Sequence, residues 1–182
     1  SEMKPKGRYN IKLAERSGVI VASSDATSLA SDVAAFYDLL KQTTVRDGFY
    51  GYSREYYQIM LKYLYESNRG ELLLATVNGE PAAGGIFVYE GPTAIYYYGA
   101  SGNKHREKMA PYLVQWTAIR RARDRGCHYY DFLGIAPPEA ARHPWRGVTD
   151  FKLKFGGEVM RHGGAYIIVN RRILYFLVSM IL

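Results

Sequence analysis

Apolar positions recur with helical spacing in the first part of the chain. Leu29–Leu40 carries large apolar side chains at i, i+4, i+7, i+8 and i+11, the pattern of an amphipathic helix. Ahead of it, Tyr9–Arg16 has helical composition and stops at Gly18, and the β-branched segment Val19–Ser23 predicts a short strand. The chain therefore opens with a helix, a strand and a second helix.

A loop over Arg46–Tyr52 is expected to separate that helix from the next one. Ser53 can cap the next helix, because a serine hydroxyl accepts a hydrogen bond from the first turn. Its apolar stripe runs along one face and ends near 68–70. The stripe consists of Tyr56, Tyr57, Met60, Leu61 and Leu64.

Two tight turns join three apolar segments in the middle of the chain. Asn78-Gly79 is a strong hairpin signal between Glu71–Val77 and Pro81–Tyr89, and Glu90-Gly91-Pro92 leads to Ala94–Ala100. Strands joined this closely run antiparallel. The segment is predicted to be a three-stranded antiparallel meander.

A long helix is predicted from about Met109 to Arg125, with Pro111 in its first turn and Gly126 as its cap. The strand that follows, Tyr129–Gly134, should lie parallel to the one before the helix. The remaining elements are a short helix, a strand and a final helix. They are expected at Thr149–Phe155, at Tyr166–Val169 and from Asn170, with the apolar stripe Ile173–Leu182 in the core or at an interface.

This order of elements resembles the GNAT acyltransferase fold. That fold is an α/β (α+β) architecture with a mixed central sheet, an antiparallel meander and flanking helices. The resemblance implies a splay between the fourth and fifth strands, where the acyl donor is received. Order alone is shared by many functions, so the chemistry must come from residues.

Composition limits the function classes. The chain has 182 residues and a net charge of +7, so its surface should attract polyanions. The lone Cys127 excludes a disulfide framework, and the four histidines show no ligand spacing, so no metal is expected. Ile173–Leu182 is about half the ~20 residues of a membrane span, and Ser1–Gly7 has no signal-peptide core. We therefore expect a soluble, cytoplasmic chain.

Coenzyme A is disfavoured by the loop that should hold it. GNAT enzymes that use it bind its pyrophosphate with backbone N–H groups of a Gln/Arg-x-x-Gly-x-Gly/Ala loop before the helix. Here Arg106 is followed by Met109 and Pro111, where glycine and small residues belong. Pro111 removes an amide donor, and Met109 fills space that the phosphate needs. No cysteine or serine nucleophile with a catalytic spacing is evident either.

Polar segments embedded in apolar surroundings carry a more specific resemblance. They resemble the FemABX family of peptidoglycan-bridge aminoacyltransferases over almost the whole chain. The segments are Arg46–Tyr50, Tyr96–Ser101, Tyr130–Ile135 and His143–Gly157, with Arg8–Ile11 and Met109–Leu113 between them. Members of this family have two GNAT-like domains. The resemblance implies that 1–18 is the connecting helix from a missing first domain and that 19–182 is the second domain.

The resemblance also implies the reaction and its partners. Family members transfer an amino acid from aminoacyl-tRNA to an amine of a UDP- or lipid-linked muramyl peptide, in the cytoplasm or at the inner face of the membrane. Aminoacyl-tRNA is the donor substrate, and no cofactor is expected. An ester is already activated, so positioning and oxyanion stabilisation supply most of the rate. Two alternatives stay open: a coenzyme A-dependent N-acyltransferase and a non-catalytic module that binds precursor or tRNA.

By resemblance, Arg46 and Tyr50 bind the acceptor's diphosphate, and the alternative for Arg46 is a surface pair with Asp47. Strand alternation places Tyr97 on the face opposite Tyr96 and Tyr98. We take Tyr97 as the substrate contact, although which of the three faces the cleft is open.

The short helix near the C-terminus supplies the candidate catalytic group. Phe151 and Phe155, at i and i+4, should pin this helix to the core, while Lys152 and Lys154 cannot share a face. By resemblance, Lys152 faces the aminoacyl-tRNA end and the developing oxyanion, with Phe151 beside it. Asp131 could act as a base, but a hydrogen-bonded carboxylate at a strand end is the favoured interpretation.

Overall fold

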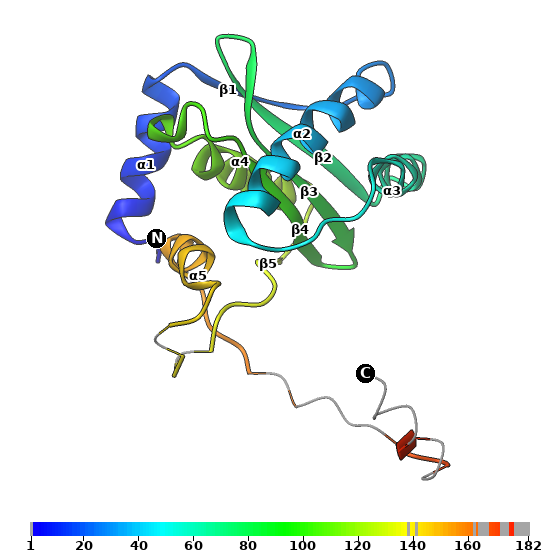
Figure 1. Ribbon diagram of the computed structural model, residues 1–182. Coiled ribbons are helices and arrows are strands. Elements are labelled where there is room, and N and C mark those ends of the chain that lie inside the picture. The colour runs from blue at the N-terminus through cyan, green and yellow to red at the C-terminus, as the bar shows by residue number, and fades with distance from the viewer. Residues whose placement is uncertain are drawn as a thin grey trace.

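A five-stranded sheet with the strand order β1-β2-β3-β4-β5 forms the centre of the molecule (Figure 1). The computed structural model describes residues 2–137, 139–140, 142–161, 163, 168–171 and 175–176. The strands are β1 (Val19–Ser23), β2 (Gly70–Val77), β3 (Glu80–Glu90), β4 (Thr93–Ser101) and β5 (Tyr129–Asp131). The helices are α1 (Pro5–Arg16), α2 (Leu29–Asp47), α3 (Arg54–Glu66), α4 (Ala110–Asp124) and α5 (Arg146–Lys152), with 3-10 turns η1 (Arg106–Lys108) and η2 (Leu153–Phe155).

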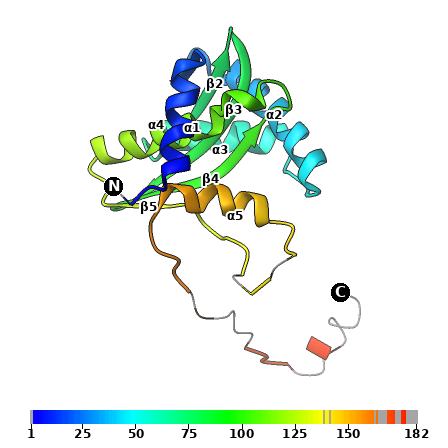
Figure 2. The ribbon, with the colours of Figure 1, turned by 90° about the vertical axis from the view of Figure 1, so that its left-hand side faces the viewer.

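Helices cover both faces of the sheet, which makes three layers (Figures 1 and 2). On one face α2 and α3 pack over a core that includes Phe36, Tyr57 and Ile86. On the other face α1 and α4 pack over a core that includes Ala14 and Phe87. Side chains of the central strands β2, β3 and β4 alternate between the two faces, so these three strands contribute to both cores. The α/β architecture with a mixed sheet is confirmed.

The turns and caps lie where the sequence places them. Asn78 and Gly79, at φ +51° and +81°, form the tight hairpin between β2 and β3. Ser53 caps α3 by accepting a hydrogen bond from the backbone N–H of Tyr56. The pairs β2–β3 and β3–β4 are antiparallel, whereas β4 and β5 are parallel across the α4 connection. The antiparallel meander and its parallel fifth strand are confirmed.

Several predicted bounds are wrong: α1 begins at Pro5 and not at Tyr9, and α5 begins at Arg146 and not at Thr149. Helix α2 continues to Asp47, so Arg46 lies in the last turn of this helix and not in the loop that follows it. The helix stops there because Gly48, at φ +71°, adopts the left-handed conformation that closes a helix at low steric cost. The fifth strand ends at Asp131, short of Gly134, because the Asp131 carboxylate accepts a hydrogen bond from the Leu133 N–H and turns the chain.

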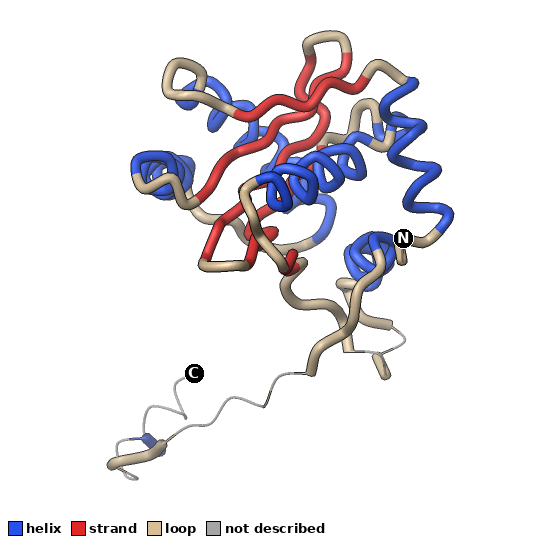
Figure 3. Tube along the Cα trace, turned by 180° about the vertical axis from the view of Figure 1, so that it is seen from behind, coloured by secondary structure: helices blue, strands red, loops and turns tan. Residues whose placement is uncertain are grey.

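The parallel pair is short, and the two strands part beyond it. Only Thr93–Ile95 of β4 pairs with Tyr129–Asp131, while β4 continues to Ser101 (Figure 3). This is the splay expected between the fourth and fifth strands. The expected strand at Tyr166–Val169 and the helix from Asn170, with Ile173–Leu182, lie largely outside the described residues.

None of the helices in the described ranges has the length and apolarity needed to cross a bilayer. The first helix, α1, is an integral part of this fold. Its inner face, with Ile11 and Ala14, is buried in the same core cluster as Val114 and Ala118 of α4.

Candidate active site

A β-bulge in β4 decides which way its three consecutive tyrosines point. Ile86 pairs with Tyr98 and Phe87 pairs with Tyr96, so Tyr97 is the extra residue of the bulge. Tyr96 therefore packs on the α1–α4 face and Tyr98 on the α2–α3 face. The predicted alternation, with Tyr97 opposite both neighbours, is wrong because one inserted residue breaks the period of two. Tyr97 remains 44% exposed beside Tyr98.

Tyr96 lies along the sheet next to the splay. Its ring stacks on Phe87 at 5.7 Å and meets Phe132 edge-on at 6.3 Å. Its hydroxyl lies over Gly99, where any side chain would collide with it. Burial raises the pKa of Tyr96 to about 12, so the phenol stays protonated at physiological pH. Sequence reasoning missed this residue as the partner of Lys152. The signal was Gly99, which leaves the space that the phenol fills.

Lys152 extends from α5 toward the splay. Its ammonium donates a hydrogen bond of 2.7 Å to the Gly134 carbonyl and lies 6.0 Å from the centre of the Tyr96 ring. Burial lowers the pKa of Lys152, and the nearby Asp131 carboxylate opposes that shift. The structure thus brings together a partly desolvated ammonium, a phenol and a carboxylate at the point where β4 and β5 part.

Phe151 and Phe155 hold α5 in place, as the sequence predicts. Phe151 contacts Tyr112 edge-on at 4.9 Å, and Phe155 stacks on the same ring at 5.7 Å. Lys154 points to a different element, since its ammonium lies 3.2 Å from the Tyr112 hydroxyl. The expectation that Lys152 and Lys154 face different ways is therefore confirmed.

A cavity of about 350 Å³ opens beside this segment, at the start of α4. Phe151 and Tyr112 form one side of it, and Ser101 and Gly102 at the end of β4 form another. The remaining wall comes from the η1 region and includes Arg106. The cavity combines apolar rings with a small number of polar groups, which is the usual make-up of a small-molecule site.

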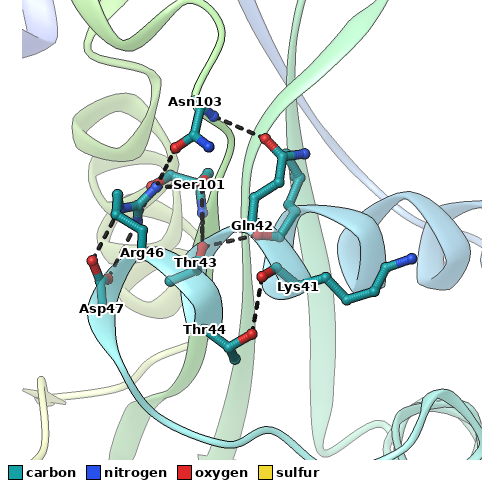
Figure 4. A network of polar contacts seen from close by, with 9 residues as sticks. Lys41, Gln42, Thr43, Thr44, Arg46, Asp47, Ser101 and Asn103 are labelled. Atoms are coloured by element: carbon teal, nitrogen blue, oxygen red, sulfur yellow. Dashed lines mark hydrogen bonds and ion pairs between the residues drawn. The ribbon is translucent and has the colours of Figure 1, made fainter.

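Arg46 reaches the same end of β4 from the opposite face (Figure 4). Its guanidinium donates to the Ser101 carbonyl at 3.0 Å, to the Ser101 hydroxyl at 3.2 Å and to the Asn103 side chain at 3.2 Å. It also makes two bonds to Asp47, at 2.9 and 3.3 Å. Thr43 and Gln42 accept hydrogen bonds from the backbone N–H groups of Ser101 and Asn103. Arg46 therefore fixes the segment that lines the cavity, and the pair with Asp47 is only part of its role.

Tyr50 lies in the loop after α2 and is fully exposed, with no side-chain hydrogen bond or ring contact to the rest of the described chain. The structure does not bring it to Arg46 or Tyr97. Next along the chain, an aromatic cluster that sequence reasoning missed covers Tyr98 of β4. Tyr52 stacks on Tyr56 at 4.3 Å, and the Tyr56 and Tyr98 hydroxyls lie 3.3 Å apart. The available signal was the aromatic Tyr52 directly before the Ser53 cap, a position whose side chain often packs onto the first turn of the helix.

Asp131 is the hydrogen-bonded carboxylate at a strand end that the sequence favoured, since it accepts from the Leu133 N–H at 2.7 Å. Among the described residues, no three His, Cys, Asp or Glu side chains are grouped so as to hold a metal ion.

The five-stranded mixed sheet, with β4 and β5 parting beyond a short parallel pair, belongs to the GNAT-like fold class. Solved acetyltransferases share the fold, among them an aminoglycoside acetyltransferase from an uncultured soil metagenomic sample. It aligns with a TM-score of 0.57 and 12% identity over 85% of this chain and 97% of its own. The structure of FemX aligns with a TM-score of 0.71 and 21% identity, over 83% of this chain and 53% of its own.

Within that class the chain belongs to the FemAB family, whose model matches residues 1–81 and 79–181. It is 30% identical over 90 residues to the aminoacyltransferase FemA of Staphylococcus epidermidis. It is 28% identical over 113 residues to the lipid II:glycine glycyltransferase of Staphylococcus haemolyticus. The alignments cover 50% and 61% of this chain but 22% and 26% of those proteins, so the chain spans only part of its curated relatives' length.

Proposed function

We propose that this domain takes part in aminoacyl transfer from aminoacyl-tRNA to an amine of a peptidoglycan precursor. The observation that carries the proposal is that Phe151 lines the cavity while its neighbour Lys152 reaches the β4–β5 splay, in a chain of the FemAB family. The relatives' names supply the reaction class, because they include an aminoacyltransferase and a lipid II:glycine glycyltransferase. A first GNAT-like domain is proposed to complete the acceptor site.

The donor end is proposed to occupy the cavity and the adjoining splay. The terminal nucleoside is proposed to enter this space with its base against the half-buried ring of Phe151, because bases stack readily on aromatic side chains. The ester carbonyl then lies near Lys152. No cofactor is needed, since an aminoacyl ester is already activated toward an amine.

The transfer itself is a single addition and elimination. The acceptor amine attacks the ester carbonyl, a C–N bond forms, and the carbonyl oxygen becomes negative in the tetrahedral intermediate. The Lys152 ammonium stabilises that oxyanion, which is the group whose charge develops during the reaction. The C–O bond to the ribose then breaks, and the proton released by the amine is taken up at the departing ribose oxygen. The products are an amide and the free tRNA 3′ end.

Arg46 is proposed to direct the acceptor. All five N–H groups of its guanidinium already donate to Asp47, Ser101 and Asn103, so a diphosphate would bind by exchanging with the exposed acceptors Asp47 and Asn103. The exposed Tyr50 and Tyr97 are proposed to contact the same substrate. A net charge of +7 suits two anionic substrates.

The direct test is a transfer assay with the full-length protein that carries this chain. A panel of aminoacyl-tRNAs is paired with a UDP-linked and a lipid-linked muramyl peptide, and amide formation is followed by mass spectrometry. Transfer of one amino acid that is lost in Lys152→Ala supports the proposal. Binding of both substrates without turnover would instead identify a non-catalytic module.

A further inference from the structure

Two glycines allow the start of α1 to touch the segment that carries Phe151 and Lys152. Gly7 lies in α1, and a Cβ there would be 2.6 Å from the Lys154 carbonyl oxygen. Gly156, at φ +85°, follows that segment, and a Cβ there would be 2.8 Å from the Glu2 backbone. Both neighbours are backbone atoms, which cannot rotate away as a side chain can. The two chain segments are therefore in direct backbone contact (Figure 2).

A hydrogen bond fixes the same contact. The backbone N–H of Lys4, the residue that precedes α1, donates to the Lys154 carbonyl at 3.0 Å. Met3 and Phe155 are both buried in one core cluster beside it. The contact is thus made by backbone groups and buried apolar side chains, and both of those resist displacement.

The connection from this contact to the site is short. Lys154 and Phe155 belong to the single turn η2, which continues directly from α5, and Lys152 is the last residue of α5. Phe151 and Phe155 are in ring contact at 5.4 Å. A shift of the Lys154 carbonyl therefore moves Phe151 and Lys152 with it.

We propose that the start of α1 is a backbone clamp, defined by Lys4, Gly7 and Gly156, that positions Lys152 and Phe151 for the reaction. Gly7 and Lys4 are positioning residues in this arrangement, because they act through the backbone of Lys154 and touch no substrate. The inference rests on the proposed role of Lys152. It goes further by assigning the geometry of the donor side to a helix that lies outside the site.

The test compares matched glycine substitutions in the full-length protein. Gly7→Ala places a methyl group against the Lys154 carbonyl, although alanine is the better helix former by about 1 kcal/mol. Gly147→Ala makes the same change on α5, where a Cβ meets nothing within 4 Å. We expect Gly7→Ala to lower kcat for transfer by about tenfold or more, since a misplacement of ~1 Å can cost 10²-fold. Gly147→Ala should leave kcat within twofold.

A second pair of variants isolates the hydrogen bond. Lys4→Pro removes the N–H donor at a position whose φ of −63° already suits proline, whereas Lys4→Ala removes only the exposed side chain. Lys4→Pro is expected to lower kcat several-fold with an unchanged KM for the acceptor, and Lys4→Ala is expected to match the wild type. Hydrogen exchange of residues 150–156 supplies a readout apart from activity. It should be faster in Gly7→Ala and Lys4→Pro and unchanged in both controls.

The outcomes separate the clamp from the proposed function. If Lys152→Ala abolishes transfer but Gly7→Ala and Lys4→Pro keep wild-type kcat and exchange, the clamp is refuted while the proposed function stands. If Lys152→Ala has no effect on transfer, the proposed role of Lys152 is refuted, and the clamp, which rests on that role, is refuted with it. A fall in kcat that both control variants share would reflect general destabilisation and would also refute the clamp.

Discussion

The hydroxyl of Tyr96 lies where a side chain on Gly99 would be, so these two residues of β4 fit together only because residue 99 is glycine. We predict that Gly99→Ala destabilises the fold by on the order of 1–3 kcal/mol, the usual cost of overpacking. Thermal or denaturant unfolding measures it.

A double-mutant cycle checks the cause of that loss. Tyr96→Phe removes the hydroxyl that the new methyl group would meet, so it should recover part of the stability lost in Gly99→Ala, with a coupling of about 0.5–3 kcal/mol. Strictly additive effects would assign the loss to the Tyr96 ring, whose Cζ would also collide with the new Cβ, or to the pairing of Gly99 with Gly85.

Much of the fold was predictable because local signals decide it. The Asn78-Gly79 turn, the Ser53 cap and the apolar spacing of α2 each depend on residues close together in sequence. The bulge at Tyr97 was not predictable in this way, because it depends on how β3 and β4 register against each other. The alternation of side chains along β4 alone does not reveal that β4 has one residue more than the stretch of β3 with which it pairs.

The site shows the same division. The opposite directions of Lys152 and Lys154 follow from helical geometry and were predicted. The contact of Gly7 with Lys154 joins residues that are far apart in the sequence, and nothing near either one indicates it. The ties of Arg46 to Ser101 and Asn103 are of the same long-range kind.

Arg46→Lys is predicted to weaken use of the acceptor much more than use of the donor. An ammonium cannot reproduce the planar fork, and charged hydrogen bonds contribute on the order of 1.5–3 kcal/mol, so the acceptor KM should rise about 10- to 140-fold. Steady-state kinetics with each substrate varied in turn measures the difference. Asp47→Ala is the matched control, since it removes the local pair and keeps the bonds to Ser101. If the KM values for the acceptor and the donor rise equally, Arg46 acts only by holding the end of β4 in place.

Acetyl-coenzyme A is predicted not to raise the melting temperature of this domain. The loop before α4 offers the pyrophosphate few amides, since Pro111 has no N–H and Met109, at φ +57°, precedes the helix with a bulky side chain. A ligand at ~100 times its Kd would add about 2.7 kcal/mol, which differential scanning fluorimetry detects readily. A clear upward shift at sub-millimolar concentration would favour an ordinary acetyltransferase.

Acid should destabilise the fold through Glu71, a carboxylate in β2 that is only 3% exposed. Burial alone would raise its pKa, but the hydrogen bonds from Arg121, Tyr89 and Ser23 outweigh burial and hold the pKa below 4.5. A lowered folded-state pKa gives stability that is present above the unfolded-state pKa of about 4.5 and is lost as the pH falls through the folded value.

Arg121→Met is predicted to cost about 1–3 kcal/mol at neutral pH, because it leaves that buried carboxylate without its ionic partner, while the 44% exposure of the Arg121 side chain lets water screen the pair. Denaturant unfolding between pH 3 and pH 7 measures both effects. Exchanging Arg123, which lies on the solvent side of α4 and pairs with Asp124, is the control and should change stability by less than about 0.5 kcal/mol. If the Arg121→Met variant is as stable as the control, the Arg121–Glu71 ion pair contributes little to the free energy of unfolding.

Lys152→Ala is predicted to lower turnover by ~10²–10³ with little change in unfolding free energy, as the removal of one oxyanion donor does in other enzymes. Lys154→Ala serves as the control and should change turnover less than a few-fold, because its ammonium lies on the Tyr112 hydroxyl. A larger defect at Lys154 would show that the other side of this helix faces the reaction, and no defect at either position would remove the segment from catalysis.

The charge of Lys152 gives a second, independent signature. Burial lowers its pKa from the ordinary 10.5, so the ammonium loses its proton at a lower pH than a free lysine does. Since the charged form stabilises the oxyanion, single-turnover transfer should fall as the pH rises through that lowered value, once spontaneous hydrolysis of the ester has been subtracted. Lys152→Arg keeps a positive charge at every accessible pH and should remove this alkaline decline, although its planar head lowers the absolute rate. An identical decline in Lys152→Arg would assign the titration to another group and leave Lys152 without an electrostatic role.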